Sequence, residues 1–250
     1  MHDFRTGSGM GRVSVWVRRV RSDAGGSAAA AATPRNVAVR ASLCCGALAG
    51  PLFVATFTAH GAALPGYDAQ RHAVSSLALG PPGGIQTANF VTTGCLYGAF
   101  AAGLWRSARE QPSSRLGPAL IGAVAVGLLG AGIFTTDPVS GYPPGTPDAL
   151  SGYSGTTAAL HDLLSVPTFL GLPAAAAVYA RTFAHRGCTR WAWYSAGTAA
   201  AMLTAFGLAS AAFSQAPTLV AQGGLYQRGA IISGFAWLTA LAVRALRTTA

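Results

Sequence analysis

Six long apolar stretches, separated by shorter polar segments, dominate the chain. A helix needs about 20 apolar residues to cross the roughly 30 Å hydrocarbon core of a bilayer, and each stretch comes close to that length. The pattern therefore predicts an all-α fold, a bundle of six transmembrane helices. An even number of spans places both ends of the chain on one side of the membrane. The predicted spans are residues 38–60, 85–105, 116–136, 160–180, 191–213 and 229–246.

Composition narrows the class of protein. Hydrophobic residues make up 51% of the 250 residues and charged residues only 10%, whereas soluble domains usually carry about 25% charged residues. So few charges cannot cover the surface of a soluble domain of this size, and the apolar content excludes a disordered chain. We expect a multi-pass protein of the cell membrane, with the lipid bilayer as its partner.

The net charge of +10 comes from arginine, because all 17 basic residues are Arg. Fifteen of them fall on one face of the predicted topology, whereas Arg71 and Arg228 fall on the other. Positive residues gather on the cytoplasmic side of membrane proteins, so both termini are predicted to be cytoplasmic. The arginines form no single basic patch with interleaved aromatic residues, and no nucleic-acid partner is expected.

The N-terminal segment differs from the rest of the chain. Residues 1–36 are rich in Arg, Ala and Gly, and their one apolar run is too short for a signal-peptide core. We expect a disordered cytoplasmic tail at 1–36, followed by a six-helix transmembrane domain at 37–250. The four cysteines lie inside predicted spans or in a cytoplasmic loop, so they predict neither a disulfide framework nor a metal site.

The two long loops on the predicted outer side hold most of the polar residues other than arginine. His72 lies in the first loop, Asp137 at the start of the second, and His161 near the start of the fourth span. Imidazole and carboxylate groups are suitable zinc ligands, and a catalytic zinc needs three of them plus water. His72, Asp137 and His161 are therefore candidate ligands of a divalent metal such as zinc.

Two further residues are candidates for catalysis beside such a metal. Ser75 follows His72 by three residues, and a helical turn would put both on one face. Asp162 directly follows His161. Either side chain is suited to position water or substrate.

Purely structural roles are alternatives for Asp137, Asp162 and His72. Asp137 precedes a proline, which is typical of a turn that ends a helix. Asp162 near a helix N-terminus complements the helix dipole. His72 is able to pair with Asp68 or Asp137, and Arg228 with any of these acids, as a lock over the outer mouth of the bundle.

In these segments the chain resembles a family of bacterial and archaeal membrane proteins catalogued as domain of unknown function 998. The resemblance covers about residues 40–247 and implies a six-helix membrane fold, but the family carries no agreed activity and supplies no mechanism. The matching pieces are His72-Ala73-Val74-Ser75-Ser76-Leu77, Gln86-Thr87-Ala88-Asn89-Phe90, Phe134-Thr135-Thr136-Asp137-Pro138, the Gly/Pro run at 141–147 and His161-Asp162.

Three functions remain open from the sequence. The first is a metal-assisted hydrolase of a lipid or envelope substrate, working at the outer face. The second is a transporter or binder of small molecules, and the third is a non-enzymatic accessory or scaffold protein of the envelope. Whether His72, Asp137 and His161 converge is the geometric feature that separates the first from the others.

Overall fold

The computed structural model describes residues 34–108 and 115–248, and most of these residues are helical. Within these residues the only β-type pairing is an isolated bridge between Val139 and Tyr142. Three short 3-10 helices lie in the loops: η1 (Ser75–Ala78), η2 (Pro81–Gly83) and η4 (Val220–Gln222). The main elements are α1 (Pro34–Ala63), α2 (Gly84–Ala108), α3 (Leu116–Ile133), α4 (Thr156–Val166), the π-helical turn η3 (Pro167–Gly171), α5 (Leu172–His185), α6 (Thr189–Phe213) and α7 (Gly223–Thr248).

All six predicted stretches are helices. The fourth is longer than predicted, because α4, η3 and α5 follow one another without a break over Thr156–His185. Pro167 begins the π-turn. A proline lacks the backbone N–H that an α-helix needs at that point, and a wider turn accommodates it. The first 33 residues of the predicted tail lie outside the described residues, and α1 begins at Pro34.

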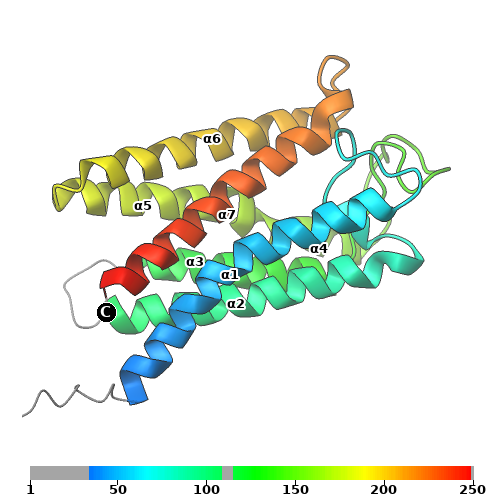
Figure 1. The fold of residues 1–250 in the computed structure, drawn as a ribbon. Coiled ribbons are helices and arrows are strands. Elements are labelled where there is room, and N and C mark those ends of the chain that lie inside the picture. The colour runs from blue at the N-terminus through cyan, green and yellow to red at the C-terminus, as the bar shows by residue number, and fades with distance from the viewer. Residues whose placement is uncertain (1–33, 109–114, 249–250) are drawn as a thin grey trace, which may run out of the picture. The chain divides into compact units, whose positions relative to one another are not determined.

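The helices form a closed ring in the order of the sequence (Figure 1). Each packs against the next: α1 on α2, α2 on α3, α3 on the rod of α4, η3 and α5, α5 on α6, and α6 on α7. The last helix, α7, then packs against α1 and closes the ring. Helices that follow one another in sequence usually lie side by side in space, which favours this arrangement.

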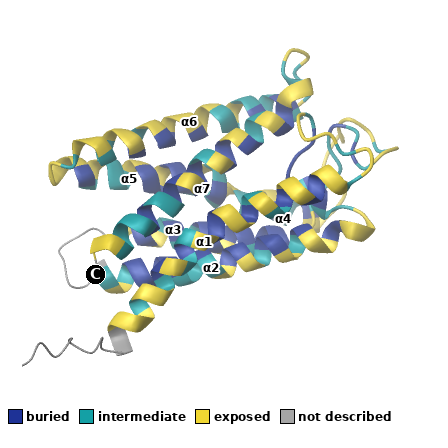
Figure 2. Ribbon diagram, viewed as in Figure 1, coloured by how far each residue is buried: buried dark blue, intermediate teal, exposed yellow. Residues whose placement is uncertain are grey.

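Five of the helical segments are long and apolar enough to cross a membrane. The exposed sides of these helices carry large apolar residues such as Leu48, Val126 and Leu203, which is expected where lipid is the neighbour. In Figure 2 the exposed residues run along the outer sides of α1 and α6. The protein is thus a multi-pass membrane protein.

The exception is α2, which is less apolar than the other five. Its polar residues Gln86, Asn89, Thr93 and Tyr97 recur at intervals of three or four and so share one face. All four are at most 5% exposed, so this face lies inside the bundle. Asn89 donates through Nδ2 to the Phe53 carbonyl oxygen of α1 at 3.1 Å. The polar residues that lower the hydropathy of α2 therefore do not face lipid.

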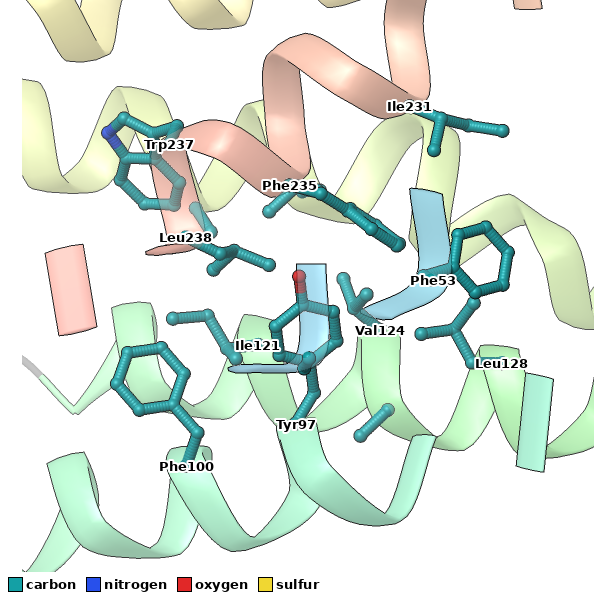
Figure 3. Packing of buried hydrophobic residues seen from close by; sticks show 14 of the residues in the cluster. Phe53, Tyr97, Phe100, Ile121, Val124, Leu128, Ile231, Phe235, Trp237 and Leu238 are labelled. Atoms are coloured by element: carbon teal, nitrogen blue, oxygen red, sulfur yellow. The ribbon is translucent and has the colours of Figure 1, made fainter. Parts of the chain in front are cut away.

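The core fills the middle of the ring with large side chains. Tyr97, Phe235 and Trp237 are each 0–1% exposed, and Figure 3 shows Tyr97 rising from α2 toward α7. The Tyr97 and Phe235 rings meet edge to face at 5.1 Å. Gly50 lets α1 approach α7 closely, because a Cβ there would lie 2.8 Å from Thr239 Oγ1 and 2.9 Å from the Phe235 carbonyl oxygen.

The two ends of the ring differ in charge. Eight described arginines lie toward the end that holds the N-terminus of α1 and the C-terminus of α7: Arg40, Arg106, Arg115, Arg181, Arg186, Arg190, Arg244 and Arg247. The long loops between α1 and α2 and between α3 and α4 lie at the opposite end. Arg71 and Arg228 are at that loop end, which also carries the candidate site.

Candidate functional site

A cavity of about 700 Å³ lies at the loop end of the ring. This volume is typical of small-molecule pockets, which range over roughly 300–1,000 Å³. Each of the six membrane-length helical segments contributes to its wall. Representative lining residues are Phe53 of α1, Phe90 of α2, Leu128 of α3, His161 of α4, Phe206 of α6 and Ile231 of α7.

The part of the wall that faces the bundle interior is apolar and largely aromatic. Phe53 lies 5.4 Å from Phe90 and 5.2 Å from Phe235, ring centre to ring centre. Phe169 stacks on Phe206 at 4.7 Å. Figure 3 shows Phe53 and Phe235 turned toward each other from α1 and α7. Such a wall suits a hydrocarbon chain.

The part of the wall near the loops is polar. Four of the five predicted site residues line the cavity here: Ser75, Asp137, His161 and Asp162. They come from the first loop, the second loop and the start of α4. The structure thus brings these four residues, which come from segments far apart in the sequence, to the wall of one cavity.

His161 is held in a single orientation. Its Nδ1 lies 2.8 Å from the carbonyl oxygen of Phe134, the residue that ends α3. A carbonyl oxygen only accepts hydrogen bonds, so Nδ1 carries a hydrogen, and in the tautomer of imidazole that this bond selects the lone pair is on Nε2. Nε2 bonds to no described residue and keeps accessible surface. Because the side chain is 3% exposed and lines the cavity, that lone pair is presented to the cavity.

The two carboxylates are held by the second loop. Asp137 accepts hydrogen bonds from the backbone N–H of Ser154, at 2.8 Å, and from the hydroxyl of the same residue. Asp162 Oδ2 accepts a hydrogen bond from the Tyr153 hydroxyl at 3.0 Å. That hydrogen bond and the charge of Asp162 raise the pKa of Tyr153. These bonds fold the 149–154 segment over the polar end of the cavity.

Sequence reasoning missed the polar residues that continue the His161 face of the helix. Ser165 and Thr168 follow His161 at positions +4 and +7 and line the cavity with it. Thr168 is 6% exposed, and its hydroxyl bonds to no described residue while keeping accessible surface. The interval of four from a candidate histidine was visible in the sequence and is the signal that identifies Ser165.

His72, the remaining predicted residue, does not line the cavity. Its Nδ1 accepts a hydrogen bond from the backbone N–H of Asp68 at 2.9 Å, so its lone pair is already used. The ring packs against Tyr142 at 5.0 Å and Tyr67 at 5.5 Å. Burial lowers the pKa of His72, partly opposed by the negative charge of Asp68.

Arg228 of α7 also binds the loop between α1 and α2, which contains His72. Its Nη1 donates to the carbonyl oxygens of Ala69 at 2.6 Å, His72 at 3.0 Å and Gly224 at 3.0 Å, and its Nη2 donates to the Tyr67 hydroxyl. Arg228 was expected to pair with an acidic side chain. In the structure it donates instead to backbone carbonyl oxygens and to a tyrosine hydroxyl. We call Tyr67, Asp68, His72 and Arg228 the loop clamp.

The predicted metal ligands do not come together as a metal centre. Over residues 34–108 and 115–248, no three His, Cys, Asp or Glu side chains are grouped so that they could hold an ion. His72 lies in the loop clamp, Asp137 bonds to Ser154, and His161 bonds to Phe134. The geometry instead provides one histidine with a free lone pair beside hydroxyls and carboxylates.

Comparison with known proteins gives a family but no activity. No curated protein matches the chain, and no solved structure does. A family model described as "Protein of unknown function (DUF998)" matches residues 47–244. The matched segment contains the whole cavity and the loop clamp. Because it covers most of the chain, the protein belongs to the DUF998 family.

Proposed function

We propose that this protein crosses the cell membrane six times, with both termini cytoplasmic, and binds a lipid-like amphiphile in the cavity from the outer side. The sixth span is α2, whose polar residues are turned into the bundle. The arginines at the end opposite the cavity support a cytoplasmic assignment for that end. The cavity then opens at the level of the outer leaflet.

A single observation supports binding of an amphiphile. One cavity of about 700 Å³ joins an aromatic wall inside the bundle to a polar end near the loops. Ligand pockets are mostly apolar with a few convergent polar groups. A molecule with a hydrocarbon chain and a polar head matches both parts, and the bilayer supplies such molecules at this depth.

Binding is the first step of two of the functions that the sequence leaves open. A hydrolase would cleave the bound amphiphile, and a transporter would move it. Occupancy of the cavity is therefore the property to measure first, and turnover or movement is measured on the same preparation.

The experiment blocks the cavity without disturbing the core. Ser210 of α6 lines the cavity and is itself exposed, so Ser210→Trp fills the cavity from its edge. Leu203→Trp is the matched control, because Leu203 is on the same helix, is 49% exposed and does not line the cavity. Both variants are reconstituted in nanodiscs, and lipids that remain bound after detergent extraction are identified by native mass spectrometry.

We expect the wild type and Leu203→Trp to retain a bound amphiphile and Ser210→Trp to lose it. Equal lipid retention by all three proteins would contradict the proposal. Circular dichroism and gel filtration check that each variant is folded.

A further inference from the structure

We propose that the bound amphiphile has a head that donates hydrogen bonds and carries no negative charge, a hydroxyl or an amine, and that His161 Nε2 accepts from it. This inference rests on the proposed function, because it names the chemical class of the molecule that the cavity binds. It follows from the hydrogen-bonding state of His161, from the charges around the cavity and from the hydroxyls beside His161.

The first step concerns His161. Its Nδ1–H is committed to the Phe134 carbonyl at 2.8 Å, which leaves Nε2 as an acceptor with no partner in the described chain. A head group with an O–H or N–H donor gives this acceptor a partner, whereas a deprotonated carboxylate or phosphate offers only acceptors.

The second step concerns charge. Among the residues that line the cavity, Asp137 and Asp162 carry charge and no arginine is present. Arg71 donates to Asp148 Oδ1 at 2.7 Å and to the Ser140 carbonyl oxygen at 3.0 Å. Arg228 is occupied by the loop clamp. An anionic head would therefore meet two carboxylates without a cation to balance it, which is costly in a partly dehydrated site.

The third step concerns the hydroxyls next to His161. Ser165 and Thr168 continue its helix face, and Ser75 reaches the same cavity from the first loop. Each of the three side chains is free of protein partners within the described residues. A hydroxyl both donates and accepts, so these groups are able to bind a head that has oxygen or nitrogen atoms of its own. The π-turn η3 carries Thr168 and places it on the cavity wall.

The test uses four compounds with the same oleoyl chain and different heads. Monooleoylglycerol offers hydroxyls, oleylamine an amine, oleate a carboxylate, and monooleoyl phosphatidate a phosphate. Each competes with radiolabelled monooleoylglycerol for the protein in nanodiscs, with empty nanodiscs as the correction for partition into lipid. We expect the hydroxyl and amine compounds to compete about tenfold more strongly than the two anions, which is the effect of making or losing one hydrogen bond.

Three variants test the role of His161 itself. We expect His161→Phe to weaken monooleoylglycerol binding about tenfold, and His161→Gln to restore part of it, because the glutamine carbonyl also accepts. His185→Phe is the matched control, since His185 is an exposed residue at the far end of α5. It should bind like the wild type.

The outcomes separate this inference from the proposed function. If no oleoyl compound binds in a way that Ser210→Trp abolishes, the proposed function fails. If all four compounds bind with equal affinity and Ser210→Trp abolishes them alike, the cavity binds amphiphiles but the inference on the head group is wrong. Tighter binding of an anion, or equal affinities for His161→Phe and His185→Phe, would also overturn it.

Discussion

The two histidines at the loop end, His72 and His161, look alike in the sequence and behave differently in the structure. Both are at most 6% exposed, and both were predicted as metal ligands. His72 accepts from a backbone N–H through Nδ1, whereas His161 donates from Nδ1 to a carbonyl. One ring has used its lone pair inside the protein, and the other presents it to a cavity. The hydrogen bond made by the first nitrogen decides the chemistry of the second.

The residues around the two histidines differ in the same way. Around His72, the polar groups of the loop clamp hydrogen-bond within the protein, and Arg228 alone donates to four oxygens. Around His161, the hydroxyls of Ser165 and Thr168 have no partner in the described part of the chain. The first region is built for stability and the second retains binding capacity. The four predictions that follow test this contrast, from the largest effect to the smallest.

Loss of Arg228 should cause the largest change in stability. Arg228→Met removes the donor to the Ala69 and His72 carbonyl oxygens and to the Tyr67 hydroxyl. Hydrogen bonds to charged groups contribute about 1.5–3 kcal/mol each, so a loss of about 3 kcal/mol or more is expected. Thermal unfolding in detergent measures it. Arg71→Met is the control, because its partner Asp148 is 62% exposed and surface pairs contribute at most about 1 kcal/mol. Equal losses of stability in Arg228→Met and Arg71→Met would contradict a special structural role of the loop clamp.

Exchange of His72 should affect stability and spare binding. His72→Phe leaves the Asp68 N–H without its acceptor, at a cost of about 1–3 kcal/mol. Because His72 does not line the cavity, retention of the bound amphiphile should stay within about twofold of the wild type. The two proteins are compared at temperatures at which the same fraction of each is folded. This is the reverse of the expectation for His161→Phe. If His72→Phe abolished binding at full stability, the division between the two histidines would be wrong.

Acid should loosen the loop clamp through His72. Burial lowers the pKa of this ring, so the unfolded chain takes up a proton at a higher pH than the folded one does. Its contribution to stability is therefore complete above the unfolded pKa of about 6.5 and is lost as the pH falls toward the folded pKa. Unfolding temperatures between pH 7.5 and pH 5 measure this loss. His72→Asn keeps an acceptor that does not titrate, and a curve as steep as that of the wild type would contradict the assignment.

The inner face of α2 carries a third kind of polar group, buried hydroxyls without a hydrogen bond. Their replacement is expected to have the smallest effect on the free energy of unfolding. Thr93 Oγ1 and the Tyr97 hydroxyl are buried and form no hydrogen bond within the described residues. Replacing such a group by an apolar one of similar shape is nearly neutral or stabilising. We expect Thr93→Val and Tyr97→Phe to change the free energy of unfolding by less than about 1 kcal/mol, or to raise it. A loss above about 2 kcal/mol would show that these hydroxyls bind something inside the bundle.

The helices were predictable because lipid imposes a strong and local requirement on sequence. Apolar runs of about 20 residues mark five of the membrane-length segments directly. The α2 segment was also found, although Gln86 and Asn89 reduce its hydropathy; their inward orientation depends on contacts with α1 that no local pattern encodes. Helix ends were less predictable, since the continuous run through Pro167 depends on a π-turn.

The sequence indicated which segments would form the site, but only some of the residues in it. Residue types grouped Ser75, Asp137, His161 and Asp162 at one end of the bundle, and all four line the cavity. They did not separate His72 from His161, because the difference lies in the Asp68 N–H and the Phe134 carbonyl. Backbone partners of this kind depend on loop conformation and helix packing. Ser154 was missed for the same reason.

The closure of the ring by α7 has a consequence for biosynthesis. Arg228 and its neighbours bond to residues 69–72, more than 150 positions earlier in the chain. The earlier helices therefore leave the ribosome while the loop between α1 and α2 still lacks its clamp. Insertion of the final helix completes the fold and secures the loop in one event. Chains that stop before α7 should persist as open bundles, and membrane proteases that survey unpacked helices would remove them.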